Sequence, residues 1–356
     1  MASTVPSRMR AALSCASTRT TRTLDDVAVP SIGAREVLVR VRACGVNHID
    51  ANAAREGYAV DVYAGRASAR RRWTPGREFS GEVVAIGRAV RGVGVGDEVY
   101  GATPPTSREG SAAEYARTPA HAIARKPREM THEEAAAIPF AALTAHRAMM
   151  VCGGARGGER ALVLGGGGAV GTAACALAKD AGLEVTATCA ARDFDFLRNV
   201  VGVDEVVDFK DTGEGSLRAR AKAEEWAPFD VAVDCVGTKA TKTQAIERLK
   251  YGVGRYVTLH GDLGKNATND GGMVAGVARA LGEYARKRAL ARFQHDVGYE
   301  QAVMRLDPDA MVTIARLVES GKLRIPVGEV LGLDEMERAY DLLRDPNVFG
   351  KVIVKP

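Results

Sequence analysis

The spacing of hydrophobic and polar residues differs between parts of the chain. Residues 36–42 alternate polar and apolar side chains, which is the period of a half-buried strand. Further short strands are expected from Met9 onward, at 82–86 and at 98–100, with Gly and Pro punctuating the segments between them. The first third therefore predicts a small all-β barrel.

The middle third alternates strand-like and helix-like runs. An alanine-rich helix is expected at 172–181. The expected strands are short and apolar, and they cover 161–164, 184–189, 206–209, 231–235 and 256–259. Strands that alternate with helices form βαβ units and a parallel sheet. The sequence thus predicts an α/β fold with a doubly wound parallel sheet after the barrel.

The last third mixes both patterns. Asp307 and Pro308 suit the N-cap and the first position of a helix. Asp334 and Glu337 have the spacing of a capping box, which predicts a second helix. The segment 348–354 predicts a closing strand.

Length and charge limit the possible functions. A chain of 356 residues predicts two domains, and a net charge of +5 suits an anionic small molecule but is too weak to indicate nucleic acid. The densest basic run is Arg66, Arg70, Arg71 and Arg72, which is expected to be a solvated loop, with a docking patch for an acidic partner as the alternative. Six scattered cysteines without a CxxC pair indicate a reducing compartment.

No segment of the sequence is predicted to cross a membrane. The uncharged segment 161–178 approaches the ~20 residues of a span, but it contains four consecutive glycines and is interpreted as strand, turn and helix. The N-terminal segment is rich in arginine, as mitochondrial presequences are, yet only eight residues precede the expected first strand. A soluble intracellular protein is the expectation.

A glycine-rich loop at 165–171 is the clearest candidate for ligand binding. Gly166, Gly168 and Gly171 fit the pattern GxGxxG between an expected strand and an expected helix. Glycines let the backbone approach a pyrophosphate, and the helix that follows directs its free N–H groups at the phosphates. The residues expected to contact a dinucleotide are Gly166, Gly167, Gly168, Ala169, Val170 and Gly171. A glycine-rich turn without a ligand is the alternative.

The end of the next strand distinguishes NADH from NADPH in such units. NAD-specific sites place an acid there to bind the ribose 2′-hydroxyl. In this sequence no acid precedes Asp193, whereas Arg192 and, after the following strand, Lys210 offer positive charges to a 2′-phosphate. NADPH is therefore the expected cofactor, unless both cations are ordinary surface residues.

A longer motif relates the chain to a known family. Residues 76–99 read GREFSGEVVAIGRAVRGVGVGDEV and match the pattern GxExxGxVxxxGxxVxxxxxGDxV at every fixed position. CGVNHID at 44–50 and IPFAALTA at 138–145 stand at the expected places around it. The sequence resembles the medium-chain dehydrogenase/reductase superfamily. Within it, the sequence is similar to the zinc-free quinone oxidoreductases, especially those of the mitochondrial reticulon-interacting type.

This resemblance implies both a fold and an assembly. It implies a GroES-like β-barrel catalytic domain formed by 1–138 and 299–356, and an inserted Rossmann domain at 139–298, with the cofactor in the cleft. It also implies a homodimer joined through the edge of the Rossmann sheet. A mitochondrial location is suggested by the resemblance, with the cytoplasm as the alternative.

The resemblance extends the cofactor site beyond the glycine loop. It implies Thr144 near the nicotinamide ribose, and Val236 and Leu259 beside the cofactor. Two positions depart from the family pattern. Ala190 stands where Ser is common, and Phe209 stands where a Tyr hydroxyl helps to hold NADPH.

Two further positions argue against a catalytic zinc. Zinc-dependent relatives bind the ion with a Cys, a His and a third ligand. Here Asn47 stands at the Cys position and Arg77 at the His position, and neither an amide nor a guanidinium suits zinc. The cysteines that a structural zinc requires are absent from 100–120. No metal is expected.

Together, these residues predict a zinc-independent, NADPH-dependent oxidoreductase that transfers hydride to a quinone or another electron-poor enone. The candidate catalytic residues are Asn47, Tyr58 and Arg77. The resemblance implies that Asn47 and Tyr58 line the nicotinamide end of the cofactor site. The alternatives are a turn residue at Asn47 and a packed surface-loop aromatic at Tyr58. Arg77 either pairs with Asp50 or Glu78 as a structural cation, or donates to the oxygen that becomes negative. The alternatives are an enoyl-thioester or 2-alkenal reductase, and a cofactor-binding interaction or structural subunit with little turnover.

Overall fold

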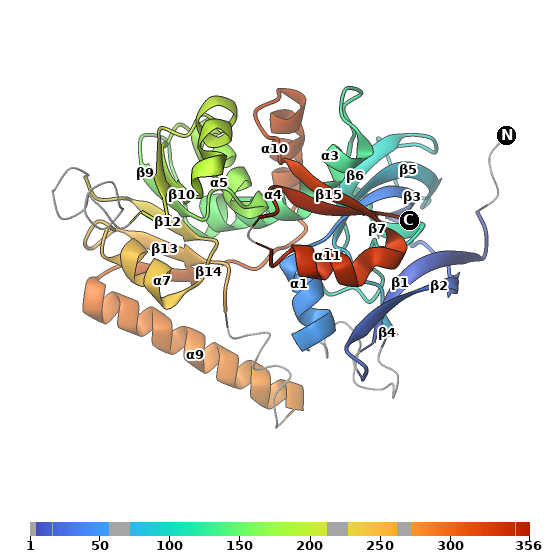
Figure 1. Cartoon of the computed structure of the whole chain (residues 1–356), viewed down its shortest axis with the longest axis horizontal. Coiled ribbons are helices and arrows are strands. Elements are labelled where there is room, and N and C mark those ends of the chain that lie inside the picture. Colours follow the sequence, from blue (N-terminus) through green and yellow to red (C-terminus); the bar gives the residue numbers. More distant parts are fainter. Residues whose placement is uncertain (1–4, 16, 57–71, 212–226, 262–271, 346) are drawn as a thin grey trace.

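Two halves lie side by side in the molecule (Figure 1). One is built around a parallel sheet from the middle of the chain, and the other around strands from both chain ends. The computed structural model describes residues 5–15, 17–56, 72–211, 227–261, 272–345 and 347–356. The mixed α/β fold expected from the sequence is confirmed.

The half from the middle of the chain contains a six-stranded parallel sheet. In chain order, its strands are β9 (Arg160–Leu164), β10 (Glu184–Cys189), β11 (Glu205–Asp208), β12 (Val231–Asp234), β13 (Arg255–Thr258) and β14 (Gly298–Gln301). They lie in the order β11-β10-β9-β12-β13-β14, and every neighbouring pair is parallel. The five strands expected in this region are therefore confirmed. The strand order reverses between β9 and β12, and ligands of α/β sheets bind at the carboxyl ends of strands around such a point.

Helices cover both faces of this sheet, which explains why its strands are apolar. The covering helices are α4 (Pro139–His146), α5 (Ala169–Asp180), α7 (Lys239–Ile246) and α9 (Gly272–His295). Side chains alternate along β9, so Ala161 and Val163 pack in the core with α4 and α5. Leu162 and Leu164 pack in the opposite core with residues of α7 and α9. The glycine loop between β9 and α5 is thereby held between two packed layers.

The other half contains two sheets that combine both ends of the chain. Their strands are β1 (Arg8–Cys15), β2 (Thr20–Ala28), β3 (Glu36–Gly45), β4 (Arg72–Trp73), β5 (Glu78–Ile86), β6 (Glu98–Ala102), β7 (Tyr115–Pro119), β8 (Ile123–Arg125), β15 (Val327–Gly332) and β16 (Lys351–Lys355). The larger sheet has the order β15-β16-β3-β5-β6-β8 with β7 beside β3, and the smaller has the order β2-β1-β4. The pairing of β16 with β3 brings the C-terminal strand beside a strand from the first part of the chain.

The predicted domain limits, 1–138 with 299–356 and 139–298, stay predictions. The parallel sheet itself extends through β14 to Gln301. The remaining α-helices of the described chain are α1 (His48–Ala51), α3 (His132–Ala136), α10 (Pro308–Glu319) and α11 (Met336–Leu342). α10 begins as predicted, because Oδ1 of Asp307 accepts the N–H of Ala310 at 3.1 Å.

Two predictions near the C-terminus need correction. The predicted capping box of Asp334 and Glu337 is wrong. The capping box instead joins Gly332 and Glu335, whose Oε2 accepts the N–H of Gly332 at 3.0 Å. The expected closing strand at 348–354 begins only at Lys351. The preceding Gly350 has a φ of +91°, which is turn rather than strand geometry.

One helical stretch in the described part of the chain is long and apolar enough to span a membrane. It runs from His132 to Cys152, and 72% of its apolar window is buried inside the fold. Such burial is typical of a core helix. The segment 161–178, interpreted from the sequence as strand, turn and helix, indeed forms β9, the glycine loop and most of α5.

Candidate active site

The glycine loop lies at the carboxyl edge of the parallel sheet. Gly168 is the N-cap of α5, so the first N–H groups of that helix have no partner within it. The N–H of Gly166 donates to the carbonyl of Thr188 at 2.7 Å, which ties the loop to β10. A Cβ at Gly171 would lie 2.1 Å from the carbonyl oxygen of Gly165, so this turn requires glycine. The six predicted loop contacts thus form one cradle at a helix N-terminus, where anions bind.

Four further cofactor candidates follow the two strands beside the loop. Ala190 follows β10, and the N–H of Phe209, after β11, donates to the carbonyl of Cys189 at 3.1 Å. The Phe209 ring is 64% exposed, and Nζ of Lys210 lies 5.9 Å from its centre. Arg192 completes this group in the turn after Ala190. The structure therefore brings these predicted residues to one edge of the loop.

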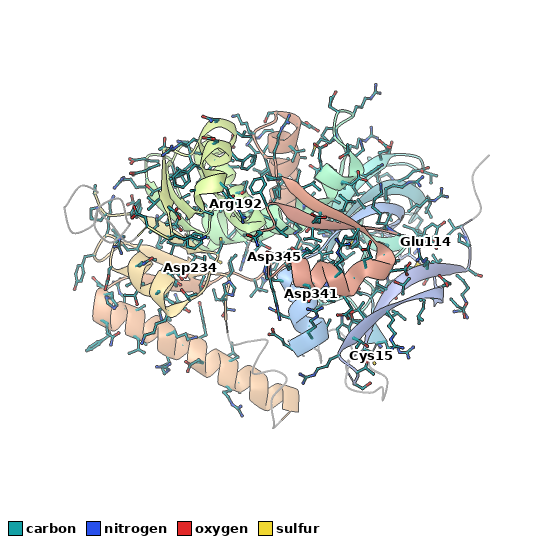
Figure 2. All side chains as sticks on the ribbon, viewed as in Figure 1. Cys15, Glu114, Arg192, Asp234, Asp341 and Asp345 are labelled. Atoms are coloured by element: carbon teal, nitrogen blue, oxygen red, sulfur yellow. The ribbon has the colours of Figure 1, made fainter. Side chains whose placement is uncertain are left out.

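Arg192 connects the two halves of the molecule. Its Nη2 donates to the carbonyl of Val348 at 3.3 Å, and its Nε lies 3.6 Å from Oδ1 of Asp193. Figure 2 shows Arg192 on the half with the parallel sheet, while Asp345 marks the region where the halves meet. The guanidinium side chain is 43% exposed beside the loop, so it is accessible to an anionic ligand.

A second loop, after β12, is fixed by a buried carboxylate. Asp234 is fully buried, and its Oδ1 accepts the N–H groups of Val236 and Gly237, both at 2.9 Å. Its Oδ2 accepts the hydroxyls of Thr241 at 2.9 Å and Tyr256 at 2.8 Å. Asp234 therefore holds the backbone of the predicted residue Val236, whose side chain packs over the start of the glycine loop. The sequence analysis missed Asp234, and its only signal was a carboxylate at the end of an apolar strand.

The loop after β13 lies next to the loop after β12. The N–H of Leu259 donates to the carbonyl of Asp234 at 3.2 Å, which places this predicted residue next to the loop after β12. The ring of His260 covers Gly237, where a Cβ would lie 2.3 Å from the ring. Nε2 of His260 lies 3.1 Å from the carbonyl oxygen of Cys235. Because a carbonyl only accepts, Nε2 must carry the proton.

A buried polar network in the other half surrounds Asn47. Nζ of Lys351 donates to Oδ1 of Asn47 at 2.6 Å and lies 2.5 Å from Oε1 of Glu78. Nδ2 of Asn47 donates to the same Oε1 at 2.9 Å. An ammonium only donates and a carboxylate only accepts, so these two partners determine which way the amide points. Lys351 had no assigned role in the sequence analysis.

Arg77 and Asp50 form a second buried pair beside this network. Nε of Arg77 lies 4.0 Å from Oδ1 of Asp50, and the side chains are 2% and 1% exposed. Nη1 of Arg77 donates to the carbonyl of Ser107 at 2.9 Å. Asp50 also accepts the backbone N–H groups of Asn47 and Gly76, at 3.0 Å and 2.9 Å. Of the two acids considered for Arg77, the structure brings Asp50 to it, while Glu78 pairs with a lysine.

Burial and charge oppose each other at these carboxylates. Burial raises the pKa of Glu78, and contact with Lys351 limits the rise. Burial likewise raises the pKa of Asp50, and Arg77 acts against it. The pKa of His48 is lowered by burial, then by the charge of Lys351, and to a smaller extent by His260.

Glu78 also links the network to α4. Its Oε2 accepts the N–H of Phe140 at 2.8 Å near the start of that helix. Thr144, the predicted ribose contact, is buried on α4 and donates its hydroxyl to the carbonyl of Phe140 at 2.7 Å. The hydroxyl oxygen keeps its capacity to accept a hydrogen bond. Tyr58, the third catalytic candidate, lies outside the described residues, as do Arg66, Arg70 and Arg71 of the basic run.

Comparison with known proteins gives two matching family models and close relatives. The zinc-binding dehydrogenase model matches residues 201–354, and the alcohol dehydrogenase GroES-like domain matches residues 33–128. The NAD(P)H oxidoreductase RTN4IP1, mitochondrial, of Mus musculus is 32% identical over 332 residues, which cover 90% of this chain and 81% of that protein. The trans-enoyl reductase pgmF of Aspergillus terreus is 30% identical over 376 residues, covering 100% of this chain and 98% of that protein.

A solved structure shows the same fold. The quinone oxidoreductase from Coxiella burnetii superposes with a TM-score of 0.76 at 24% sequence identity, covering 98% of this chain and 99% of that chain. The resemblance stated from the motifs is therefore confirmed, including its similarity to mitochondrial oxidoreductases of the reticulon-interacting type. The chain belongs to the medium-chain dehydrogenase/reductase superfamily and is an oxidoreductase that uses a nicotinamide cofactor.

Proposed function

We propose that this oxidoreductase transfers hydride from NADPH to a quinone or another electron-poor enone, without zinc. The observation that carries the proposal is the enclosed network at the position where zinc-dependent relatives hold their ion. Asn47 is held by Lys351 and Glu78, and Arg77 is held beside Asp50. Among the described residues, no three His, Cys, Asp or Glu side chains gather in a way that suits a metal.

The glycine cradle fits a dinucleotide. The free N–H groups at the start of α5 would bind the pyrophosphate, and the absence of a side chain at Gly171 lets the loop close tightly before that helix. Arg192 and Lys210 are the cations available to a 2′-phosphate, and the exposed ring of Phe209 offers a stacking surface to adenine. The loops that carry Val236 and Leu259 would line the nicotinamide end. When bound, the reduced nicotinamide supplies the hydride.

Asn47 is the residue that we propose to act on the substrate. Its Nδ2 carries two hydrogens, and the bond to Glu78 uses one of them. The second hydrogen would be donated to the substrate oxygen that becomes negative as hydride arrives. Lys351 keeps the amide in this orientation, because a flipped amide would turn its NH₂ group toward the ammonium. One such preorganised donor contributes about 10²–10³ in rate.

Arg77 has a structural role in this proposal. Its side chain is 2% exposed, and its guanidinium lies between Asp50 and the carbonyl of Ser107. This burial favours the structural-cation role over direct donation to substrate. Tyr58 stays a candidate for lining the nicotinamide end of the site.

One relative favours a second reaction on the same site. The trans-enoyl reductase pgmF is similar over the whole length of this chain, so reduction of an enoyl thioester or a 2-alkenal is the alternative. Asn47 would then donate to the thioester or aldehyde oxygen in the same way. A cofactor-binding subunit with little turnover is the third possibility, since Ala190 and Phe209 each lack a hydroxyl common in the family.

Substitution of Asn47 tests the proposal. Asn47→Ala should leave NADPH binding nearly unchanged and lower kcat about a hundredfold, because it removes a donor to the reacting oxygen. Asn347→Ala, at an exposed asparagine, is the matched control and should keep the parent kcat. Unchanged kcat in Asn47→Ala would contradict the assigned role, and turnover with enals but not quinones would favour the alternative reaction.

The proposal includes an assembly and a compartment. We propose a homodimer contact at β14, because β14 is an edge strand of the parallel sheet in the described part of the chain, and edge strands offer backbone groups to a neighbouring chain. A mitochondrial location follows the names of the relatives, with the cytoplasm as the alternative. A monomeric mass by light scattering at micromolar concentration would contradict the dimer.

A further inference from the structure

Residues 348–350, the bridging segment, lie just before β16 and contact the other half of the molecule. The ring of Phe349 stands edge-to-face against the ring of Phe196, with the ring centres 6.2 Å apart and the planes at 79°. Phe196 belongs to the half with the parallel sheet, where it follows the turn after β10. The carbonyl of Val348 accepts a hydrogen bond from Nη2 of Arg192 in the same half, at 3.3 Å. Two contacts therefore join the bridging segment to the parallel-sheet half.

The bridging segment is also packed tightly against β15 in its own half. Gly350 has a φ of +91°, and a Cβ there would lie 2.6 Å from the carbonyl oxygen of Pro326. A Cβ at Gly328 would lie 2.5 Å from the carbonyl oxygen of Phe349. The N–H of Lys351 donates to the carbonyl of Pro326 at 2.7 Å. Close-packed backbone yields little, so a displacement of Phe349 is passed on to Lys351.

Lys351 connects the bridging segment to the buried network around Asn47. It stands two residues after Phe349, and its side chain is 5% exposed. Its Nζ donates to Oδ1 of Asn47 at 2.6 Å and lies 2.5 Å from Oε1 of Glu78. A buried ammonium that leaves these acceptors loses charge-assisted hydrogen bonds, so its place determines how the Asn47 amide points. One continuous set of contacts thus runs from Phe196 to Asn47.

We propose that Phe349 is a positioning residue for hydride transfer, whose ring contact with Phe196 keeps Lys351 where it orients the Asn47 amide. The contact relates the half that carries Asn47 to the half that carries the glycine loop. This inference rests on the proposed function, in that Asn47 is taken to donate to the substrate oxygen. The Phe349 ring is 36% exposed, so burial supplies only part of its interaction and the ring pair supplies the rest.

Substitution of Phe349 separates positioning from simple stabilisation of the contact between the halves. Phe349→Leu removes the aromatic pair and keeps an apolar side chain, whereas Phe349→Tyr keeps the ring. Phe293→Leu makes the same change at a phenylalanine of α9 that is 90% exposed, and serves as the matched control. The full chain is assayed for kcat, for KM of the acceptor and for the dissociation constant of NADPH. Thermal unfolding of each variant reports on folding.

The expected result is a selective loss of turnover. An aromatic pair changes an equilibrium by about two- to tenfold, so Phe349→Leu should lower kcat by about that factor and leave the NADPH dissociation constant little changed. Phe349→Tyr and Phe293→Leu should keep the parent kcat. In the Asn47→Ala background, Phe349→Leu should have no further effect on kcat, because it acts through the amide that is already absent. A merely stabilising contact would lower the unfolding temperature without this dependence on Asn47.

The side-chain amide of Asn47 provides a second readout that needs neither cofactor nor substrate. Its resonances in a proton–nitrogen correlation spectrum are assigned by their loss in Asn47→Ala. Phe349→Leu should shift or broaden these resonances, because Lys351 then holds Oδ1 of Asn47 less firmly. Phe293→Leu should leave them at the parent positions.

The possible failures are distinguishable. Parent kcat and unshifted Asn47 resonances in Phe349→Leu would overturn this inference and leave the proposed function standing, as would a loss of kcat that persists undiminished in the Asn47→Ala background. If Phe349→Leu does not fold, Phe196→Leu with the parent kcat and resonances would overturn it equally. Failure of the parent chain to consume NADPH with any acceptor would overturn the proposed function, while the Asn47 resonances would still test the contact.

Discussion

Replacement of Arg77 by methionine is the sharpest test of how the metal-free site is held together. The guanidinium and the carboxylate of Asp50 are 2% and 1% exposed as side chains, with Nε and Oδ1 4.0 Å apart. At that separation, two unit charges attract by about 4 kcal/mol at an effective dielectric constant of about 20. Removing one partner of a buried pair typically costs about 3–5 kcal/mol, because the other charge stays buried.

The expected result for Arg77→Met is therefore a loss of about 3–5 kcal/mol of unfolding free energy, with kcat per folded molecule and NADPH affinity little changed. Two backbone N–H groups also bind Asp50, at 2.9 Å and 3.0 Å, so the loss should lie nearer the lower value. Chemical and thermal unfolding measure the effect, and about 2–4 °C per kcal/mol is expected for a domain of 150–250 residues. Arg88→Met, at an exposed arginine, is the control and should change stability by less than about 0.5 kcal/mol.

A double-mutant cycle makes the reasoning refutable. If the pair is the cause, Asp50→Asn combined with Arg77→Met should cost less than the sum of the single changes. Near-normal stability with kcat lowered about a hundredfold would show instead that Arg77 acts on the reacting oxygen. Unaltered stability and unaltered kcat together would show that Arg77 has neither role.

Three further outcomes follow from the structure. Iodoacetamide should label Cys15 before the other thiols and with an apparent pKa near 6, because a hydrogen bond with Ser17 lowers the pKa of Cys15 to about 6; labelling only at alkaline pH would contradict this. Arg316 lowers the pKa of Asp180 through a hydrogen bond, so this pair stabilises the fold above the usual carboxyl range and its contribution is lost as pH falls below about 4. Asp180→Asn should cost less than about 1 kcal/mol and flatten that part of the pH–stability curve, and parallel curves for parent and variant would contradict the assignment. Elemental analysis should find far less than one zinc per chain and a chelator should leave turnover unchanged, whereas stoichiometric zinc would refute the argument from Asn47 and Arg77.

Elements with a strong local pattern were predictable from the sequence. The limits predicted for β10, 184–189, are those of the structure, because an apolar run between polar and small residues has few alternatives. The glycine loop could be placed for the same reason, since it lies between a clear strand and a clear helix. The prediction of a capping box at Asp334 was wrong because the spacing of two residues does not by itself determine which residue caps a helix. In the structure Glu335 accepts the N–H of Gly332, so the box begins two residues earlier.

Contacts between distant segments were not predictable in this way. Lys351 and Asn47 are 304 positions apart in the sequence, and no local sequence pattern indicates that β16 places Lys351 beside Asn47. Asp234 ends its strand as an ordinary polar residue would, and only the folded structure shows which backbone N–H groups its carboxylate accepts. The candidate site could therefore be located from the sequence, whereas the residues that position it required the structure.

Turnover of NADPH with a panel of quinones and enals tests the central claim most directly. The account predicts that the purified chain, treated with a chelator, consumes NADPH in proportion to an electron-poor acceptor. It also predicts that Asn47→Ala slows this reaction about a hundredfold without weakening NADPH binding. Tight NADPH binding with no consumption of NADPH by any acceptor in the panel would contradict the account and identify the chain as a cofactor-binding subunit.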